Sequence, residues 1–544
     1  MRLLHLSGSL PNVVKMISKN PKDGPFDIIL VTGDIHIDHP LCGTGIISRV
    51  LEKAGFSVGI IEQPDWKSNE DFIKLGKPRL FFGVSSGAMD SMIDNYTPLK
   101  KERKYDEFSK YVSKKPDRAV IVYCNKLKEN FKGIPIVIGG IEASLRRFGH
   151  YDYWINDIRK SILLDSKADI LCYGNAEHST VEIAKRFDEK KELNAIEGTC
   201  IAAKEIPKGF EELPAFDKIS KNTEESKKEF CKMQLMFSAA KNLAQKHDTR
   251  YVLQYKIHNC TSKELDEIYE LPYSRDVPKE AEYFKGMQFS VVTHRGCFGN
   301  CSFCSLALHQ GTKIISRSEE SILKEIKQIA KHKDFNGFID DLGGPSANMY
   351  GMDCKSNCSN CLTCAKLDKS HSKLIQLLKK TRKIKGIKKI FIRSGIRYDL
   401  AAESNEYLQE ISEHHIAGCL KIAPEHFDEK VLKLMNKNFP GKFKIFAEKF
   451  NKINEPLNQY IKCYFMTAHP GCTIENTHEL AEFFNNLKEN SIDVESVQVF
   501  TPTPMTLSTC MYYTGMNPLT LEKIYIPYTY AEKKEQKRIL YRKP

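Results

Sequence analysis

A short loop with three cysteines constrains this chain more than any other feature. The segment Cys297-Phe-Gly-Asn-Cys301-Ser-Phe-Cys304 spaces the thiols as CxxxCxxC. A β-branched run over 287–293 precedes the loop, and a periodic stretch from Ile322 to Ile329, opened by Ser318, follows it. This pattern predicts a buried strand, a thiol-bearing loop and a helix, which is the first unit of an alternating β/α fold.

Three thiols at this spacing favour a metal centre. They can bind three irons of a cubane cluster and leave the fourth iron open, whereas a structural zinc site closes all four positions. Zinc remains an alternative, with His294 or His309 as the fourth ligand, and unliganded thiols are the third reading. The strand before the loop and the helix after it favour the iron–sulfur reading.

The cysteine loop resembles the signature of radical S-adenosylmethionine (SAM) enzymes, CxxxCxΦC, in which Φ is aromatic and is Phe303 here. The resemblance implies a [4Fe-4S] cluster on Cys297, Cys301 and Cys304. It also implies that SAM binds the open iron and is cleaved reductively to a 5′-deoxyadenosyl radical.

The region 286–510 alternates strands with helices. Beside the strand before the cysteines, apolar runs at 337–340, 389–392, 418–422, 461–466 and 496–500 each lead into a polar loop with glycine or proline. Six such units predict a radical SAM core built as a partial (β/α)6 barrel, with its working residues at the carboxyl ends of the strands.

Several residues follow those strands and are candidates for the site. By comparison with radical SAM barrels, we expect Gly343 and Gly344 to admit the SAM amino group, because a Cβ would block its approach. Polar partners for SAM and candidate catalytic residues follow the later strands. The SAM candidates are Ser394 and Arg397, and the catalytic candidates are Glu425, His426 and His469.

The region 1–200 also alternates strands and helices, which predicts an N-terminal doubly wound parallel sheet. It has a partial likeness to cobalamin-binding domains in Asp34-Ile-His36 and Gly139-Gly140, but His39 stands where their DxHxxG motif has glycine. We therefore expect no corrinoid here. The segment 201–285 is expected to be a helical connection, and 511–544 a basic, solvated extension.

A second group of cysteines follows the glycine pair. Four thiols lie at Cys354, Cys358, Cys361 and Cys364. They suffice for a complete tetrathiolate shell, so we expect a second metal centre, either an auxiliary iron–sulfur cluster or zinc, with free thiols as the alternative.

Composition narrows the setting. The 544 residues carry 17 cysteines and a net charge of +13, with no secretory leader and no long apolar run. We expect a reducing cytoplasm and no membrane span. The mild positive charge permits a nucleic-acid substrate without indicating one.

Longer strings carry a closer resemblance. Segments spread over nearly the whole chain, among them 140–147, 294–299, 309–311, 394–400, 423–426, 469–471 and 500–505, carry it. In these segments the chain resembles the YgiQ family of radical SAM proteins. The resemblance implies a YgiQ-type N-terminal domain and a radical SAM core with no assigned substrate. We expect an electron donor such as flavodoxin or ferredoxin. The alternatives are a methyltransferase or methylthiotransferase acting on RNA or protein, and a zinc-stabilised RNA-binding or scaffold protein.

Overall fold

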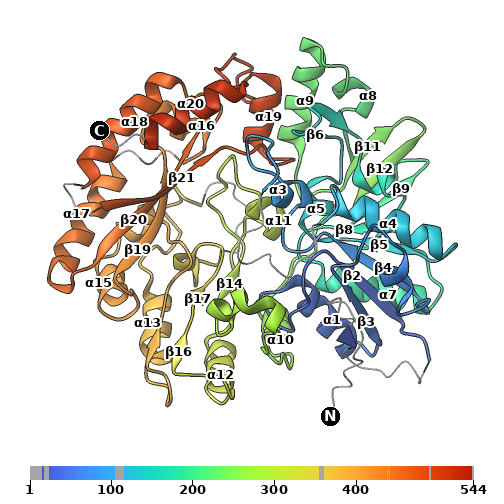
Figure 1. Ribbon diagram of the computed structural model, residues 1–544, viewed down its shortest axis with the longest axis horizontal. Helices are drawn as coiled ribbons and strands as arrows, with labels where there is room; N and C mark the ends of the chain where they lie inside the picture. Colours follow the sequence, from blue (N-terminus) through green and yellow to red (C-terminus); the bar gives the residue numbers. More distant parts are fainter. Residues whose placement is uncertain are drawn as a thin grey trace.

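The computed structural model describes residues 15–16, 24–103, 115–354, 361–437, 439, 441–488 and 492–541. Figure 1 shows two α/β units side by side, with the N-terminal unit on the right and the barrel on the left. Within the described ranges, no helix is both long enough and apolar enough to cross a bilayer.

In the part of the chain that the structure describes, the N-terminal unit is built on a ten-stranded sheet. Its parallel centre has the order β3 (Val58–Glu62), β2 (Ile28–Thr32), β4 (Phe81–Ser85), β5 (Ile136–Ile138) and β8 (Ile170–Cys172). Alternate residues of β2 enter two different cores: Ile29 and Val31 one, Ile28 and Leu30 the other. The sheet is therefore covered on both faces, by helices such as α1 (Gly43–Lys53), α4 (Ala119–Asn130) and α7 (Glu177–Asp188), as the sequence predicts.

The segment 201–285 differs from the helical prediction. After β9 (Thr199–Ala203) it contains β10 (Glu211–Leu213), β11 (Leu243–His247) and β12 (Arg250–Gln254), which extend the same sheet. Helix α9 (Glu224–Met236) ends before β11 begins, so only part of this segment is helical. The strands were missed because their polar, charged residues, such as Gln245, Lys246 and Gln254, hide the apolar alternation.

The second unit is an open barrel of parallel strands. Strand β13 (Val291–Val292) pairs with β17 (Leu342–Gly343), and β16 (Phe338–Ile339) with β18 (Lys389–Ile390). The longest strands, β19 (Cys419–Glu425), β20 (Tyr460–Thr467) and β21 (Ile492–Val499), form one parallel sheet. Helices α12 (Glu319–Ile329), α13 (Ser372–Thr381), α15 (Asn405–His414), α17 (Lys442–Asn454) and α18 (Ile474–Lys488) lie outside the strands in Figure 1. The predicted barrel is confirmed.

The C-terminal segment packs against the barrel. Helix α20 (Tyr530–Tyr541) buries Lys533, Gln536 and Ile539 and leaves Lys534 and Lys537 exposed. Its buried positions recur every three residues, so one face of a basic helix covers β20 and β21. The expectation of a solvated tail is therefore corrected, because charge alone concealed this narrow buried face.

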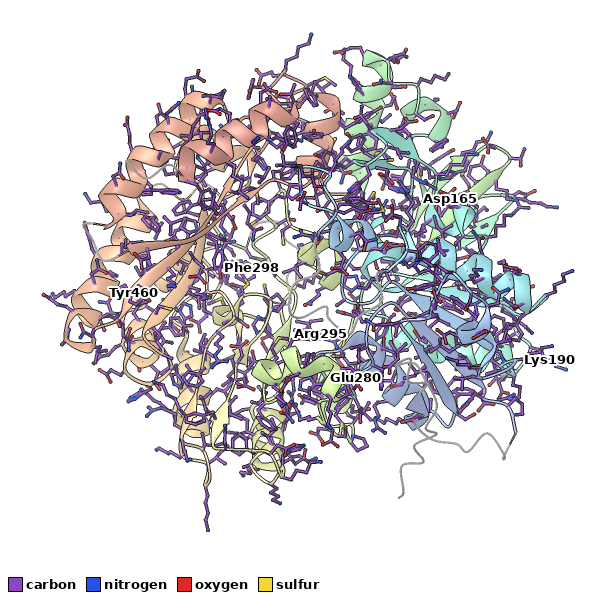
Figure 2. The ribbon with its side chains drawn as sticks, viewed as in Figure 1. Asp165, Lys190, Glu280, Arg295, Phe298 and Tyr460 are labelled. Atoms are coloured by element: carbon purple, nitrogen blue, oxygen red, sulfur yellow. The ribbon has the colours of Figure 1, made fainter. Side chains whose placement is uncertain are left out.

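The two units meet at the cysteine loop. Arg295, in β14 (His294–Arg295), forms a buried ion pair of 2.7 Å with Glu177 of α7. His309, in α11 (Leu306–Gln310), lies 3.1 Å from the hydroxyl of Ser144 in α5 (Gly140–Leu145). Figure 2 places Arg295 and Phe298 at the centre of the molecule, between the two units. The N-terminal unit therefore buttresses the loop that carries the thiols.

Candidate metal and SAM site

The cysteine loop is fixed by backbone contacts. The amide of Cys297 donates to the carbonyl of Gly311 at 3.1 Å, and that of Cys304 to the carbonyl of Cys301 at 3.0 Å. Gly296 has φ +85°, and a Cβ there would lie 1.9 Å from the carbonyl oxygen of Lys313, so only glycine fits. All three cysteines are partly buried, with no disulfide among them.

Two buried cations flank the thiols. Arg397 directs one guanidinium nitrogen at the sulfur of Cys301, 3.9 Å away. Lys437 is almost fully buried, and its charge and that of Arg397 both favour the thiolate of Cys297. A cluster held by three thiolates carries net negative charge, so positive neighbours suit it.

The protonation of the thiols also fits a metal site. Burial raises the pKa of Cys304 to about 11, although the amide of Leu306 and the charge of Lys437 oppose this shift. Burial likewise raises the pKa of Cys297, against the amide of Gly299. Metal binding replaces these protons and removes the cost of a buried thiolate. The donor set and its surroundings therefore fit an iron–sulfur cluster.

The glycine pair is tightly packed by the chain itself. A Cβ on Gly344 would lie 2.5 Å from a carbon of the His294 ring, and one on Gly343 would lie 2.8 Å from the hydroxyl oxygen of Ser394. Val292 and Gly343 are partners in the parallel pairing of β13 with β17, which brings the glycines beside the cysteine strand. Glycine is needed here for internal packing, a reason the sequence did not reveal.

The two polar SAM candidates are both held by aspartates. Ser394 donates its hydroxyl to Asp341, which also accepts the backbone amides of Arg393 and Ser394 at 2.7 and 3.0 Å. Arg397 binds Asp399 through a two-pronged contact of 3.0 and 3.1 Å. We expected the guanidinium of Arg397 to bind the SAM carboxylate, but two of its nitrogens already bind Asp399. Its third nitrogen faces Cys301.

The three catalytic candidates lie at the ends of β19 and β20; His426 and His469 are buried and Glu425 is partly buried. Glu425 has φ +71° and pairs with Lys437 at 3.4 Å, and burial raises its pKa. The Nδ1 atom of His426 accepts the amide of Asp428 at 3.0 Å, which leaves the proton on Nε2, 3.6 Å from the sulfur of Cys472. Burial lowers the pKa of His426 to about 4.

His469 is fully engaged. Its Nδ1 donates to the carbonyl of Pro470 at 2.8 Å, so its Nε2 accepts the hydroxyl of Ser508 at 2.6 Å. Its ring stands edge-on to Phe303 of the cysteine motif, with centroids 6.3 Å apart. Burial lowers its pKa to about 3, so the imidazole is neutral. These contacts suit a residue that positions the cysteine loop.

The second cysteine group is described only in part, since Cys358 lies outside the described residues. Cys354 is exposed, while Cys361 and Cys364 are half-buried in a turn where the amide of Cys364 donates to the carbonyl of Cys361 at 3.2 Å. Cys361 packs against the same small apolar cluster as Cys297, which contains Phe298, Met349 and Leu400. Cys361 of the second group thus lies close to the first group.

Sequence reasoning missed the loop 435–437. The carbonyl of Met435 accepts the amide of Ser302 at 2.9 Å, and the side chain of Asn436 donates to the carbonyl of Asn300 at 2.8 Å. These contacts bring Lys437 beside the cysteine loop. No signal marks this lysine in the sequence, because it stands in a lysine-rich stretch between two helices.

Comparison with protein families divides the chain into three parts. A model described as "Radical SAM N-terminal" matches residues 10–289, one for the radical SAM superfamily matches 291–484, and a domain of unknown function, DUF3362, matches 495–544. The first boundary falls just before β13, so the strands β9–β12 belong with the N-terminal match.

Curated relatives match over nearly the full length. A UPF0313 protein of Methanocaldococcus jannaschii, MJ1155, is 47% identical and covers 95% of this chain and 89% of its own. A UPF0313 protein of Clostridium botulinum is 46% identical over 94% of this chain and 84% of its own. A UPF0313 protein of Methanosarcina acetivorans is 43% identical over 99% of this chain and 80% of its own.

Solved structures share the fold at low identity. The radical SAM methyltransferase TsrM of Kitasatospora setae, solved with tryptophan and a SAM analogue, has a TM-score of 0.52 at 13% identity and covers 89% of this chain and 77% of its own. The cobalamin-dependent enzyme OxsB, solved with aqua-cobalamin, has a TM-score of 0.50 at 13% identity. The match covers 89% of this chain and 55% of OxsB. The family match and the relatives together show that the chain belongs to the UPF0313 family, also called YgiQ, and that it is a radical SAM enzyme.

Proposed function

We propose that Cys297, Cys301 and Cys304 hold one [4Fe-4S] cluster and that SAM binds between this loop and the glycine pair. When bound, the cluster and SAM supply the 5′-deoxyadenosyl radical that abstracts hydrogen from the substrate. The observation that carries the proposal is the buried pair of cations, Arg397 and Lys437, around three closely spaced thiols. The substrate is unassigned.

The residues of the chain have distinct proposed roles. Arg397, fixed by Asp399, stabilises negative charge at Cys301, and Ser394 with Asp341 holds the strand end against Gly343. Glu425 is the proposed proton-transfer group, because it is a partly buried carboxyl with a raised pKa beside Lys437. His426 is kept as a neutral donor and His469 as a positioning residue.

The decisive experiment is anaerobic reconstitution with SAM and dithionite. We expect 5′-deoxyadenosine from the wild type and none from the Cys297→Ala/Cys301→Ala/Cys304→Ala variant. A Cys260→Ala variant is the matched control, because Cys260 stands apart from both cysteine groups. Undiminished 5′-deoxyadenosine from the triple variant would refute the ligand assignment.

We also propose a second metal centre on Cys354, Cys358, Cys361 and Cys364. The packing of Cys361 and Cys297 on one apolar cluster supports a centre near the first. About eight irons per chain would indicate an auxiliary cluster, and four irons with one zinc a structural site. Four irons without zinc in fully reconstituted protein would leave free thiols. An auxiliary cluster would favour the alternative of methylthiolation of RNA or protein.

We propose that the N-terminal sheet of this chain takes no corrinoid, although TsrM and OxsB were solved with cobalamin. Asp34, after β2, pairs with buried Lys115 at 2.5 Å, and a Cβ on Gly33 would lie 2.4 Å from the carbonyl oxygen of Ser86. The chain's own groups therefore crowd the strand ends where a corrinoid would enter. Corrinoid absorbance retained after incubation with hydroxocobalamin and gel filtration would contradict this.

The remaining proposals concern the setting. A reductive cleavage needs one electron, and we propose flavodoxin or ferredoxin as its donor and the cytoplasm as the location. Rapid 5′-deoxyadenosine formation with reduced flavodoxin in place of dithionite would support the donor, and none with either protein would oppose it.

A further inference from the structure

A cavity of about 440 Å³ lies away from the cysteine loop, between the N-terminal unit and the C-terminal segment. Its walls come from the hairpin of β6 (His150–Asp152) and β7 (Asp157–Arg159), from α9 and from α19 (Leu507–Thr514). The volume falls within the ~300–1,000 Å³ of small-ligand sites. The lining residues are Lys100, Tyr151, Tyr153, Asn156, Asn222, Lys227, Tyr512, Tyr513 and Tyr528.

Tyrosine rings dominate the walls. Tyr151 stacks on Tyr513 with centroids 4.9 Å apart, and Tyr528 stands edge-on to Tyr512 at 5.3 Å. Tyr528 is half exposed, with 51% of its surface open. The other lining tyrosines are buried by their packing, so the rigid cluster presents Tyr528 as the ring whose face is open to a planar ligand.

The cavity is positively charged. Lys227 lies over the ring of Tyr513 and Lys100 over that of Tyr153, while no carboxylate stands among the described lining residues. Behind the wall, Lys533 is 2% exposed and donates to the hydroxyls of Tyr153 and Tyr512 at 2.9 and 2.8 Å. Among the described residues, no carboxylate pairs with Lys533.

An ammonium that is buried without a counter-charge is costly, and a bound anion would reduce the cost. Burial lowers the pKa of Lys533 to about 8. The charge of Lys100 acts in the same direction, and the charge of Glu532 opposes them. The hydroxyl of Tyr513 is buried without a hydrogen-bond partner among the described groups. The exposed ring of Tyr528 and the ammonium groups of Lys100 and Lys227 thus line one space, and Lys533 adds positive charge behind its wall.

We propose that this cavity binds a nucleotide, with its base stacked on Tyr528 and its phosphate held by Lys100 and Lys227. Base stacking on aromatic side chains and lysine contact with phosphate are the general means by which proteins hold single nucleotide units. The site is separate from the thiols and does not depend on the proposed cluster chemistry.

Helix α19 connects the cavity to the cysteine loop. At its start, the amide of Ser508 donates to the carbonyl of Ser302 at 2.9 Å, and four and five residues later Tyr512 and Tyr513 line the cavity. Four residues of helix span about 6 Å. Tyr512 and Tyr513 therefore stand about one helical turn from the residue of α19 that contacts the cysteine loop. The nucleotide could be a free molecule or one unit of an RNA strand.

Calorimetry on the reconstituted full chain tests the proposal, with SAM saturating so that its own site is filled. The probes are uridine 5′-monophosphate, uridine, inorganic phosphate and a single-stranded uridine decamer. We expect the monophosphate to bind at one site and more tightly than uridine or phosphate. Tyr528→Ala and Lys227→Ala should each weaken binding about tenfold.

Lys228→Ala is the matched control, since its exposed side chain is next to Lys227 on α9 but does not line the cavity. Binding of the decamer alone, sensitive to Lys227→Ala and Tyr528→Ala, would support the site and identify RNA as its source. Binding of phosphate as tight as that of the monophosphate, unaffected by Tyr528→Ala, would overturn the proposal. So would failure of both the monophosphate and the decamer to bind.

Discussion

At the scale of single residues, the candidate site is defined by groups that pack against one another. Gly344 faces His294, Ser394 is bound by Asp341, and Arg397 by Asp399. Each residue chosen from the sequence for SAM has a partner within the chain. Replacing one of these residues therefore alters the support of the site as well as its contact with ligand.

Gly344→Ala tests which effect dominates. Because the new Cβ would overlap the His294 ring, we expect a loss of about 1–3 kcal/mol of stability, measured as a lower thermal unfolding temperature without SAM. Gly395→Ala, whose Cβ meets nothing within 4 Å, is the control. The Gly344→Ala/His294→Ala pair should recover part of the loss. Unchanged stability with weaker SAM binding would mean that the glycine serves only the ligand.

Lys437 tests the electrostatic part of the site. Lys437→Met removes a positive charge beside Cys297 and Cys304. The loss of this charge stabilises the oxidised cluster relative to the reduced one. We therefore expect the midpoint potential of the cluster to fall, on the order of tens of millivolts. Titration monitored by electron paramagnetic resonance measures it. Lys437→Met leaves the carboxyl of Glu425 without its partner, so a Lys437→Met/Glu425→Gln double variant is measured as well. Lys433→Met, an exposed change on α16 (Glu429–Leu434), is the control. An unchanged potential in both Lys437 variants would place this charge too far away to matter.

At the scale of elements, helices outside the barrel hold its loops. The carboxamide oxygen of Gln536, in α20, accepts the hydroxyl of Thr467 and the amide of Ala468, both at 2.8 Å, and its nitrogen donates to the carbonyl of Cys472 at 2.9 Å. Together with the bond from Ser508 of α19 to His469, these contacts fix the loop after β20.

Gln536→Leu should release that loop. It leaves buried donors and an acceptor unpaired, at about 1–3 kcal/mol for each group, so we expect a clear fall in unfolding temperature. The exposed neighbour change Lys537→Gln should have no such effect. Equal unfolding temperatures for Gln536→Leu and wild type would show that α20 does not support the barrel.

At the scale of the whole molecule, buried neutral histidines make stability depend on pH. Burial lowers the pKa of His150 and His469 to about 3, and that of five others to about 4: His247, His294, His309, His371 and His426. In the unfolded chain these groups bind protons near their ordinary value of about 6.5. The unfolded state therefore gains protons first as pH falls.

Stability should thus be complete above pH 7 and decline as pH falls through 6.5 toward 4. Between pH 7 and 5.5 we expect a loss on the order of 1 kcal/mol for each such histidine, seen as a lower unfolding temperature. His371→Asn should flatten the dependence, since asparagine tolerates the φ of +62° at this position. The exposed change His478→Asn should not. A wild-type unfolding temperature that stays constant between pH 7 and 5.5 would contradict the expected loss of stability at low pH.

Local patterns in the sequence determined the architecture. Apolar runs that end in glycine or proline predicted the parallel strands of both units, because backbone period and burial are properties of neighbouring residues. The spacing of Cys297, Cys301 and Cys304 predicted a cluster for the same reason, because all the proposed ligands lie on one loop. The strands β10–β12 were missed because they carry polar residues whose partners lie elsewhere in the fold. For example, the side-chain oxygen of Gln245 accepts the amide of Gly149.

Only the tertiary structure decided which distant residues surround that loop. Lys437 comes from a turn 133 residues beyond Cys304, and Glu177 comes from the other unit. The tyrosines of the proposed nucleotide cavity come from segments more than 350 residues apart. No local pattern marks such residues, because the ion pairs and ring contacts that define them depend on how the units pack. The thiols were therefore readable from the chain, and their electrostatic surroundings only from the fold.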